Sequence, residues 1–398
     1  MPPQRKSKKF SLSTIAAYST LLLTVMGAIA GAIKYSEDIG AWIQKIFPKP
    51  MCTVDVRYPS VVPTHLKYYY DSEGLGKEES LYWFHIKAQN KTRESLTLNV
   101  SFAMVPTDCA YVVLKSKDAV AYTLQAKEEN REESISPPLE FTQYNATTPC
   151  YLKVNYKIEN QRKELVRANV VEISLLPTHT VKWDLLNPEG KPVSRTFLLS
   201  SLAGWSMSKD GRLLKRVDDL EKRTHADSPE QWLKASYDDL FKGSSAVKVL
   251  PTARTYPFSG ERVIGLPSEI LSERFAEPLE AGLLMASMIR AAPPARQTRL
   301  TLFILPRPGG ISHTLVLLAW SVPGSSEWQT IDLAKATTLE FKSNIQESEK
   351  LLRLMLAQKP EIIASLRRDG IFEGNAENSP IAISLDRAAE RFQIRSVE

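Results

Sequence analysis

Cysteine and an excess of charge of one sign are both scarce in this chain of 398 residues. Three cysteines exclude a disulfide-dense scaffold and a zinc site built from cysteines alone. The 51 Lys and Arg residues nearly balance 45 Asp and Glu, and no basic stripe interleaves with aromatic residues, so we expect no nucleic-acid partner. A second long apolar segment is also missing, which excludes a polytopic membrane protein.

The common motifs of cofactor and metal chemistry are missing from the sequence as well. It contains no phosphate loop, no His-Glu-x-x-His, no Gly-x-Ser-x-Gly and no dinucleotide fingerprint. We therefore expect no cofactor and no metal centre. The composition, 43% hydrophobic and 24% charged residues, is that of a globular protein, and the length predicts two soluble domains.

The N-terminus predicts a membrane anchor. Residues 10–33 carry no charged side chain, and about 20 helical residues cross a bilayer core. The preceding tail, residues 1–9, is basic and should stay in the cytoplasm, which leaves the later domains outside it. We predict a single-pass protein of a bacterial inner membrane, with a linker at 34–50 and periplasmic domains; a cleaved signal peptide is the alternative. Gly27 and Gly31 have the spacing that lets helices approach closely, so a homodimer through the anchor is a further prediction.

The three cysteines all precede the second soluble domain. In an oxidising compartment one pair should form a disulfide, and we predict Cys109–Cys150. The sequence leaves Cys52 open as a partner of either residue, and it leaves open three buried free thiols.

Residues 51–180 predict an all-β sandwich. Apolar side chains alternate with other residues, which is typical of strands with one buried face. The clearest runs are Leu96–Met104, Leu152–Ile158 and Val171–Leu175, with a charged loop predicted at Lys127–Ser134.

Isolated polar and aromatic residues in the same region predict no catalytic site. His65, His85 and His179 are expected to be surface or strand histidines rather than ligands. The run Tyr68-Tyr69-Tyr70 fits either a half-buried strand edge or a ligand surface.

After a connector at 181–208, residues 209–398 predict an α+β domain. Leu213, Val217 and Leu220 share one helical face, and Ser228 can cap a second helix. The segment from Pro278 to Ala292 is apolar nearly all round and should form a buried central helix. Strands are predicted at Arg299–Leu305, His313–Trp320 and Trp328–Leu333, followed by further helices, so the chain as a whole is α+β.

The order of these pieces resembles the transglutaminase-like domains of the papain-like superfamily. The resemblance begins near Leu213 and extends to the C-terminus, and it depends on the order of the pieces rather than on one specific motif. The segments that carry it are Leu266–Arg274, Leu283–Ala291, Ile311–Val316, Trp328–Leu333 and Asp386–Phe392.

The resemblance implies a reaction that this chain lacks the nucleophile to perform. The family requires a Cys at the start of the buried helix, a His on the first facing strand and an Asp on the next. His313 and Asp332 match the last two positions, whereas Pro278 occupies the Cys position and no Cys follows Cys150. Proline suits the first position of a helix, so the substitution retains the helix start without the thiol.

Three functional hypotheses follow. The first is a membrane-anchored binding or scaffold protein, whose inactive transglutaminase-like domain engages a protein or peptide partner. The second is an envelope hydrolase in which His313, Asp332 and a carboxylate from Glu277 or Glu280 assist the attack of water. The third is a structural spacer of a membrane complex, assembled through Gly27 and Gly31.

Overall fold

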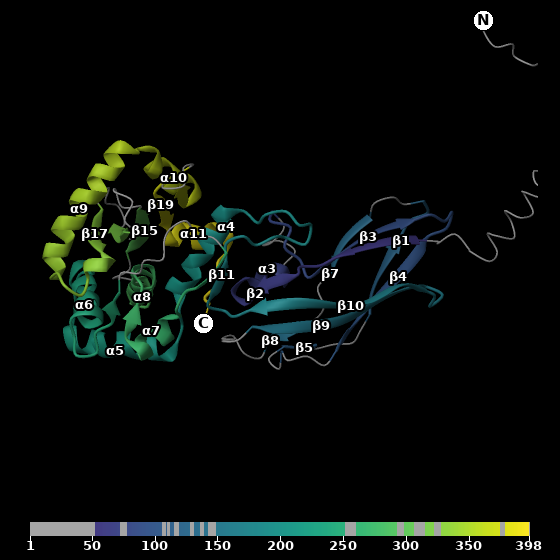
Figure 1. Ribbon diagram of the computed structural model, residues 1–398, viewed down its shortest axis with the longest axis horizontal. Coiled ribbons are helices and arrows are strands. Elements are labelled where there is room, and N and C mark those ends of the chain that lie inside the picture. The colour runs from purple at the N-terminus through teal and green to yellow at the C-terminus, as the bar shows by residue number, and fades with distance from the viewer. Residues whose placement is uncertain are drawn as a thin grey trace, which may run out of the picture.

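The computed structural model describes residues 52–71, 78–105, 109, 112–114, 119–127, 131–135, 139–141, 149–250, 260–292, 298–305, 315–321, 328–374 and 379–397. Figure 1 shows two bodies along the long axis, a β-rich body followed by a mixed α and β body, with the C-terminal end of the chain near their junction. Within the ranges given, no helix combines the length and apolarity needed to span a bilayer. The predicted anchor at 10–33, with Gly27 and Gly31, lies outside the described residues.

The β-rich body contains two main sheets. One has the order β1-β3-β7 and the other the order β2-β10-β9-β4-β6, with a separate pair β5-β8. The strands are β1 (Cys52–Arg57), β2 (Val61–Pro63), β3 (Phe84–Asn90), β4 (Leu96–Met104), β5 (Val112–Leu114), β6 (Val120–Leu124), β7 (Arg131–Ile135), β8 (Leu139–Phe141), β9 (Cys150–Asn160) and β10 (Leu165–Leu176).

The predicted alternation is confirmed along the central strands. Every second residue of β9 is buried, starting from its first, and the same holds for β4 up to Phe102. Phe84 on β3 lies with its ring centroid 5.0 Å from Phe102 on β4 and 5.8 Å from Tyr156 on β9. These aromatic contacts join the two sheets, so the two sheets face each other across one core, as in a sandwich.

The prediction of a charged loop at Lys127–Ser134 is wrong for its second half, because β7 pairs antiparallel with β3 from Arg131 onward. The segment is an edge strand of its sheet, where charged side chains are tolerated because one side of the strand faces solvent. Glu132 accepts a 2.7 Å hydrogen bond from Lys87 on the neighbouring strand. Cross-strand ion pairing therefore replaces the apolar alternation that would have revealed the strand.

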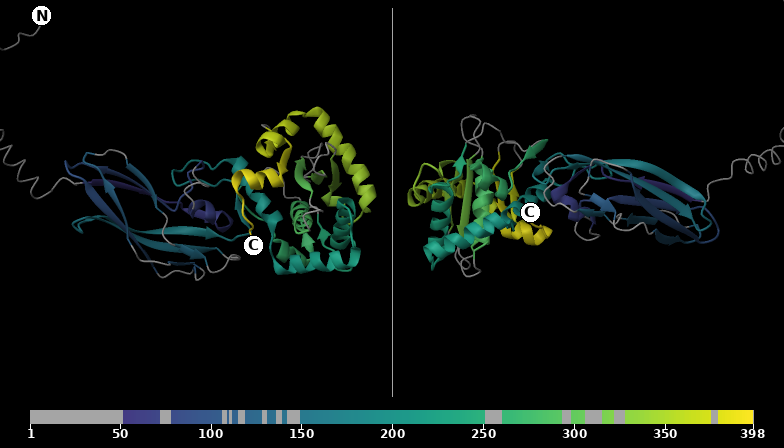
Figure 2. Two further views of the ribbon diagram at one scale, coloured as in Figure 1. Left: turned by 180° about the vertical axis from the view of Figure 1, so that it is seen from behind. Right: turned by 90° about the horizontal axis from the view of Figure 1, so that it is seen from below.

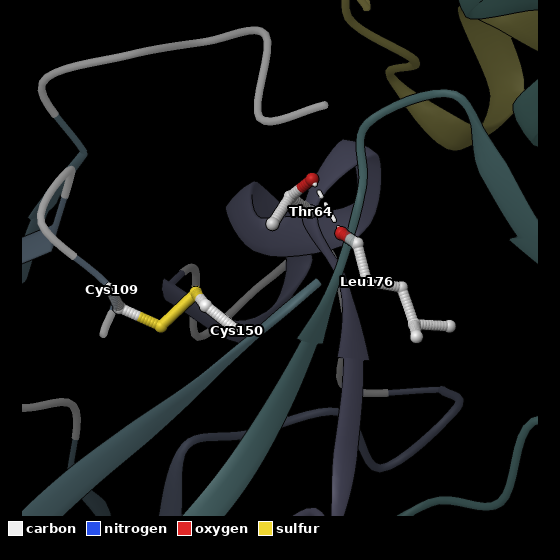
Figure 3. Close-up of a disulfide and its surroundings, with 4 residues drawn as sticks. All are labelled: Thr64, Cys109, Cys150 and Leu176. Atoms are coloured by element: carbon white, nitrogen blue, oxygen red, sulfur yellow. Dashed lines mark hydrogen bonds between the residues drawn. A yellow bond between two sulfur atoms is a disulfide. The ribbon is translucent and has the colours of Figure 1, made fainter. Parts of the chain in front are cut away.

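A disulfide joins Cys109 to Cys150, as predicted, with Cα atoms 5.3 Å apart (Figure 3). Both residues are buried, and Cys52 is a buried free thiol. Nearby, the Thr64 hydroxyl donates to the Leu176 carbonyl at 2.9 Å, fastening the chain after β2 to the end of β10. A disulfide is typical of proteins in oxidising, extracytoplasmic compartments.

The second body is built around a five-stranded antiparallel sheet of order β17-β16-β15-β19-β18. Its strands are β15 (Arg299–Leu305), β16 (Leu315–Ser321), β17 (Gln329–Asp332), β18 (Ile371–Glu373) and β19 (Ile381–Ser384), and shorter strands are β11 (Thr180–Lys182), β12 (Lys248–Val249), β13 (Glu261–Val263) and β14 (Phe275–Ala276). Its helices are α4 (Arg195–Ser201), η2 (Leu202–Met207), α5 (Gly211–Thr224), α6 (Pro229–Phe241), α7 (Pro267–Glu273), α8 (Pro278–Arg290), η4 (Leu333–Lys335), α9 (Phe341–Gln358), α10 (Glu361–Asp369) and α11 (Leu385–Phe392).

Helix α8 is the central helix that the sequence predicts. Its residues from Leu283 to Ile289 are all buried, and it packs on η2, α6, α7 and β16. Leu352 on α9 and Ile362 on α10 form a second core with Phe303 and Leu317 of the sheet, separate from the core that contains α8. The sheet thus lies between α8 and the pair α9–α10 (Figure 2).

The predicted start of α6 at Ser228 is confirmed. The Ser228 hydroxyl accepts the N–H of Gln231 at 3.2 Å and so caps α6. The Gln231 side chain, however, accepts from the N–H of Asp227 at 2.8 Å, one residue ahead of the usual capping-box partner.

The junction between the two bodies is aromatic. Tyr69, on the short helix α3 (Lys67–Asp71), packs edge-on against Phe197 of α4, with ring centroids 4.8 Å apart. His65, in the turn η1 (Thr64–Leu66), packs on Trp205 with centroids 5.1 Å apart, so the expectation of a surface or strand histidine is wrong for His65. The tyrosine run is therefore helical, so its interpretation as a strand edge is wrong, and Tyr69 lies at the junction of the two bodies.

Residues 181–208 also contribute to the second body. Trp205 is fully buried, and its indole N–H donates to the Ile264 carbonyl at 3.2 Å. The Trp205 carbonyl in turn accepts from Ser287 on α8 at 2.7 Å. These bonds fix η2 against the central helix.

Candidate functional site

The candidate site lies at the start of α8, where the resemblance places a nucleophile. Pro278 is the first residue of the helix and is buried. Proline fits this position because its missing N–H would have no helical partner there, and its fixed φ matches the helix. The position therefore starts a helix well but offers no reactive atom.

Glu280 completes the helix start by accepting two backbone hydrogen bonds. One carboxylate oxygen accepts the N–H of Glu277 at 2.7 Å, and the other accepts the N–H of Gly265 at 2.7 Å. Burial raises the pKa of the Glu280 carboxyl, while the two N–H donors act in the opposite direction. Its second bond ties α8 to the chain ahead of α7, so this carboxylate already has a structural role.

Glu277 is paired as well. Its carboxylate forms an ion pair with Arg262 on β13, and both side chains are largely buried. The pair links the strand β13 to the first turn of α8. A carboxylate held in this way has one oxygen directed at a guanidinium rather than at a water-filled site.

Asp332 lies at the end of β17 and is 1% exposed. One carboxylate oxygen caps η4 by accepting the N–H of Ala334 at 2.9 Å. Asn344 on α9 holds the Asp332 backbone from both sides, accepting its N–H at 2.7 Å and donating to its carbonyl at 3.0 Å. The same amide donates to the Tyr237 hydroxyl at 3.1 Å, which ties the strand end to α6.

Asp332 and the start of α8 belong to neighbouring elements. A Cβ added at Gly282 of α8 would lie 3.7 Å from Leu333, the residue after Asp332, and 2.9 Å from Leu302 on β15. The glycine permits the close approach of helix, strand and turn. His313 lies outside the described residues, so the proposed contact between His313 and Asp332 stays a prediction.

Sequence reasoning located Glu277, Glu280 and Asp332 but missed their partners. Arg262, Gly265 and Asn344 are 12 to 15 residues away from the groups they bind. The acidic residue at the third position of a Pro-initiated helix was a usable signal for the cap. No comparable local signal exists for Asn344, because its role depends on how α9 packs on β17.

Together the two bodies define a disulfide-containing protein in which a β-sandwich precedes an α+β domain with a buried central helix. In the part of the chain that the structure describes, no three His, Cys, Asp or Glu side chains form a group able to hold a metal ion.

Comparisons with known proteins assign no family. No protein-family model matches the chain, and no curated protein matches it. Among solved structures, a FixG-related protein from Vibrio parahaemolyticus aligns with 32% of this chain and 97% of its own, at 11% identity and a TM-score of 0.18. A similarity at that TM-score carries no argument about fold or function.

Proposed function

We propose that this protein is a membrane-anchored binding or scaffold protein of the bacterial inner membrane, with its two domains in the periplasm. Its second domain is a transglutaminase-like domain without catalytic activity, and it engages a protein or peptide partner. The observation that carries the proposal is the start of α8. There, buried Pro278 stands at the position where the family has its nucleophile, and the Glu280 carboxylate accepts hydrogen bonds from two backbone N–H groups.

The disulfide supports the location. Cys109–Cys150 is stable where the surroundings are oxidising, as in the periplasm. The N-terminal end of β1 lies at the end of the sandwich remote from the second body (Figures 1 and 2). An anchor ahead of β1 would therefore hold the sandwich near the membrane and present the second domain away from it.

The hydrolase hypothesis has less support. It requires Glu277 or Glu280 to accept a proton from water, yet the first is ion-paired and the second accepts two backbone N–H groups. The spacer hypothesis depends on Gly27 and Gly31, which lie outside the described residues, so no contact in the structure favours it.

A turnover assay on the full-length protein tests the absence of catalysis. The substrates are a glutamine-containing peptide with a primary amine, and the same peptide in water alone. We expect no release of ammonia or cleaved peptide from the wild type or from His313→Ala. Turnover in the wild type that His313→Ala abolishes would overturn the proposal in favour of the hydrolase.

Site-specific photo-crosslinking in the native envelope tests the binding role. Phe275 is 49% exposed on β14, three residues before Pro278, and Leu354 on α9 is 62% exposed. A photo-reactive residue at 275 should give one discrete adduct, and the same residue at 354 should not. If both positions give the same adducts, or if neither gives any, the start of α8 is not the binding surface.

A further inference from the structure

A positively charged groove lies on the second domain between α5 and the turn that connects α6 to β12. It encloses about 670 Å³, and none of its lining residues belongs to α8. Five of its lining side chains are cationic and two are acidic, so three positive charges are in excess. The cations are Arg212, Lys215, Arg216, Lys222 and Arg223, and the acids are Asp219 and Asp239.

The cations form a stripe because of the helical period. The five cationic positions 212, 215, 216, 222 and 223, together with Asp219 between them, recur at three- and four-residue intervals, which keeps their side chains on one face of α5. The buried residues Leu213, Val217 and Leu220 point the other way, into the core. At 1.5 Å per residue, the stripe from Arg212 to Arg223 is about 16 Å long.

Two of the cations are already committed to holding the groove together. Arg216 binds Asp239 through its Nε at 2.6 Å, and Arg223 binds the other oxygen of the same carboxylate at 2.7 Å. Arg216 also donates to the Asp239 carbonyl at 2.7 Å. Asp239 on α6 therefore holds its side of the groove against α5. The two guanidinium groups together carry one more positive charge than Asp239 neutralises.

The remaining cations are available to a ligand. Within the described residues, Arg212 contacts the Ser272 hydroxyl rather than a carboxylate, and no carboxylate pairs with Lys215. Lys222 forms an exposed pair with Asp218, and such a pair contributes little to stability and exchanges readily. The opposite wall ends in Ser244 and Ser245, whose exposed positions add hydroxyl donors.

We propose that this groove binds an acidic peptide segment of a protein partner. The charge is the first reason, because arginine and lysine side chains bind carboxylates in charge-assisted hydrogen bonds. The second reason is spacing: Asp219 separates a cationic group at 212–216 from another at 222–223, about 10 Å apart along the helix axis. In the polyproline II conformation, which has three residues per turn, carboxylates three residues apart lie on one face of a peptide and span a similar ~9 Å. A compact polyphosphate would instead need cations that converge on one point.

This inference rests on the proposed function only in expecting a protein partner. The groove and the start of α8 share no residue, so each can fail alone. Crosslinks at position 275 test the α8 surface, and charge variants on α5 test the groove.

The experiment measures binding of a fluorescein-labelled decapeptide, with glutamate at every third position and serine elsewhere, to the full-length protein in mild detergent. Arg212→Glu together with Lys215→Glu should weaken binding at least tenfold. The matched control is Lys342→Glu with Lys350→Glu, two exposed lysines on α9, which changes net charge equally and should alter affinity less than twofold. The neutral pair Arg212→Gln and Lys215→Gln should weaken binding by an intermediate factor, and thermal melts identify any unfolded variant.

Three results would overturn the inference. The first is the absence of any binding of the peptide to the wild type in 50 mM salt, where screening of charges is weak. Equal losses of affinity in the α5 and α9 variants would mean that the peptide is held only by the overall charge of the protein and not by the groove. Tight binding of inositol hexakisphosphate, with no binding of the decapeptide, would identify the groove as a site for a compact phosphate ligand.

Discussion

The Tyr69 hydroxyl donates a hydrogen bond to the Phe392 carbonyl at 3.2 Å, although 323 residues separate them in sequence. Tyr69 lies on α3, next to the sandwich, and Phe392 ends α11, the last helix of the second domain. The Phe197 ring packs against both residues, with centroids 4.8 and 5.8 Å away. The two bodies are thus joined by a packed aromatic cluster and by the C-terminal chain, rather than by a simple linker.

The first prediction concerns this cluster. Tyr69→Phe should cost about 1 kcal/mol, because it removes one hydrogen bond, and Tyr69→Ala should cost about 3–5 kcal/mol, because it also leaves a cavity among buried rings. Urea unfolding of the full chain, with limited proteolysis between the two domains, measures both effects. Tyr151→Phe, at a 52% exposed position on β9, is the control and should change neither. Equal effects at positions 69 and 151 would mean that the cluster does not couple the domains.

The second prediction concerns the chain after α11. A Cβ at Gly204 would lie 2.7 Å from the backbone oxygen of Arg395, closer than folded proteins permit, so Gly204→Ala should displace residues 394–397. Overpacking of this kind costs about 1–3 kcal/mol. Gly211→Ala meets nothing within 4 Å and serves as the control.

A truncation after Gln393 turns this into a double-mutant cycle. If the clash with the tail is the whole cause, Gly204→Ala should have no further effect on the urea midpoint of the truncated chain. A full additional loss in the truncated chain would place the cause elsewhere.

The third prediction concerns the disulfide. It spans 41 residues, and the chain-entropy estimate gives a stabilisation of about 4 kcal/mol for a loop of that length. Cys109→Ser with Cys150→Ser should therefore lower the free energy of unfolding by about that amount, and dithiothreitol should destabilise the wild type but not the double variant. Cys52→Ser keeps the disulfide and should retain the sensitivity to dithiothreitol. A wild type indifferent to dithiothreitol would contradict a stabilising role for the bond.

The sequence predicts elements best where burial leaves a regular apolar pattern along the chain. Alternation marks β4 and β9 because one face of each strand is buried, and continuous apolarity marks α8 because all of its faces are buried. The same patterns do not predict strand β7, since its stability comes from pairing with β3 and from ion pairs such as Lys87–Glu132.

The candidate site divides in the same way. Pro278 and Glu280 are readable because a helix start is a local motif. The bond from Gly265 to Glu280 and the clamp of Asn344 on Asp332 arise from tertiary packing, so no local pattern encodes them. His65 illustrates the opposite error: an isolated histidine looks ordinary in sequence, yet its environment is set by Trp205, which is far along the chain.

The last prediction uses that environment. Both ring nitrogens of His65 are buried without hydrogen-bond partners within the described residues. Burial lowers the pKa of His65 to about 3, from an ordinary value near 6.5. The folded protein therefore holds the neutral ring between these two values, whereas the unfolded chain binds a proton below the upper one.

The sign of the pH dependence follows from this difference in proton binding. As pH falls from about 6.5 toward 3, His65 binds a proton in the unfolded chain but stays neutral in the folded protein. His65 should therefore lower the free energy of unfolding by up to about 1.4 kcal/mol per pH unit. His65→Gln should remove this component, which urea unfolding at pH 7, 6, 5 and 4 would reveal as a shallower slope. His225→Asn, at the exposed end of α5, is the control and should leave the slope as it is in the wild type. If His65→Gln and the wild type lose stability in parallel, the acid sensitivity of the domain junction lies in other groups.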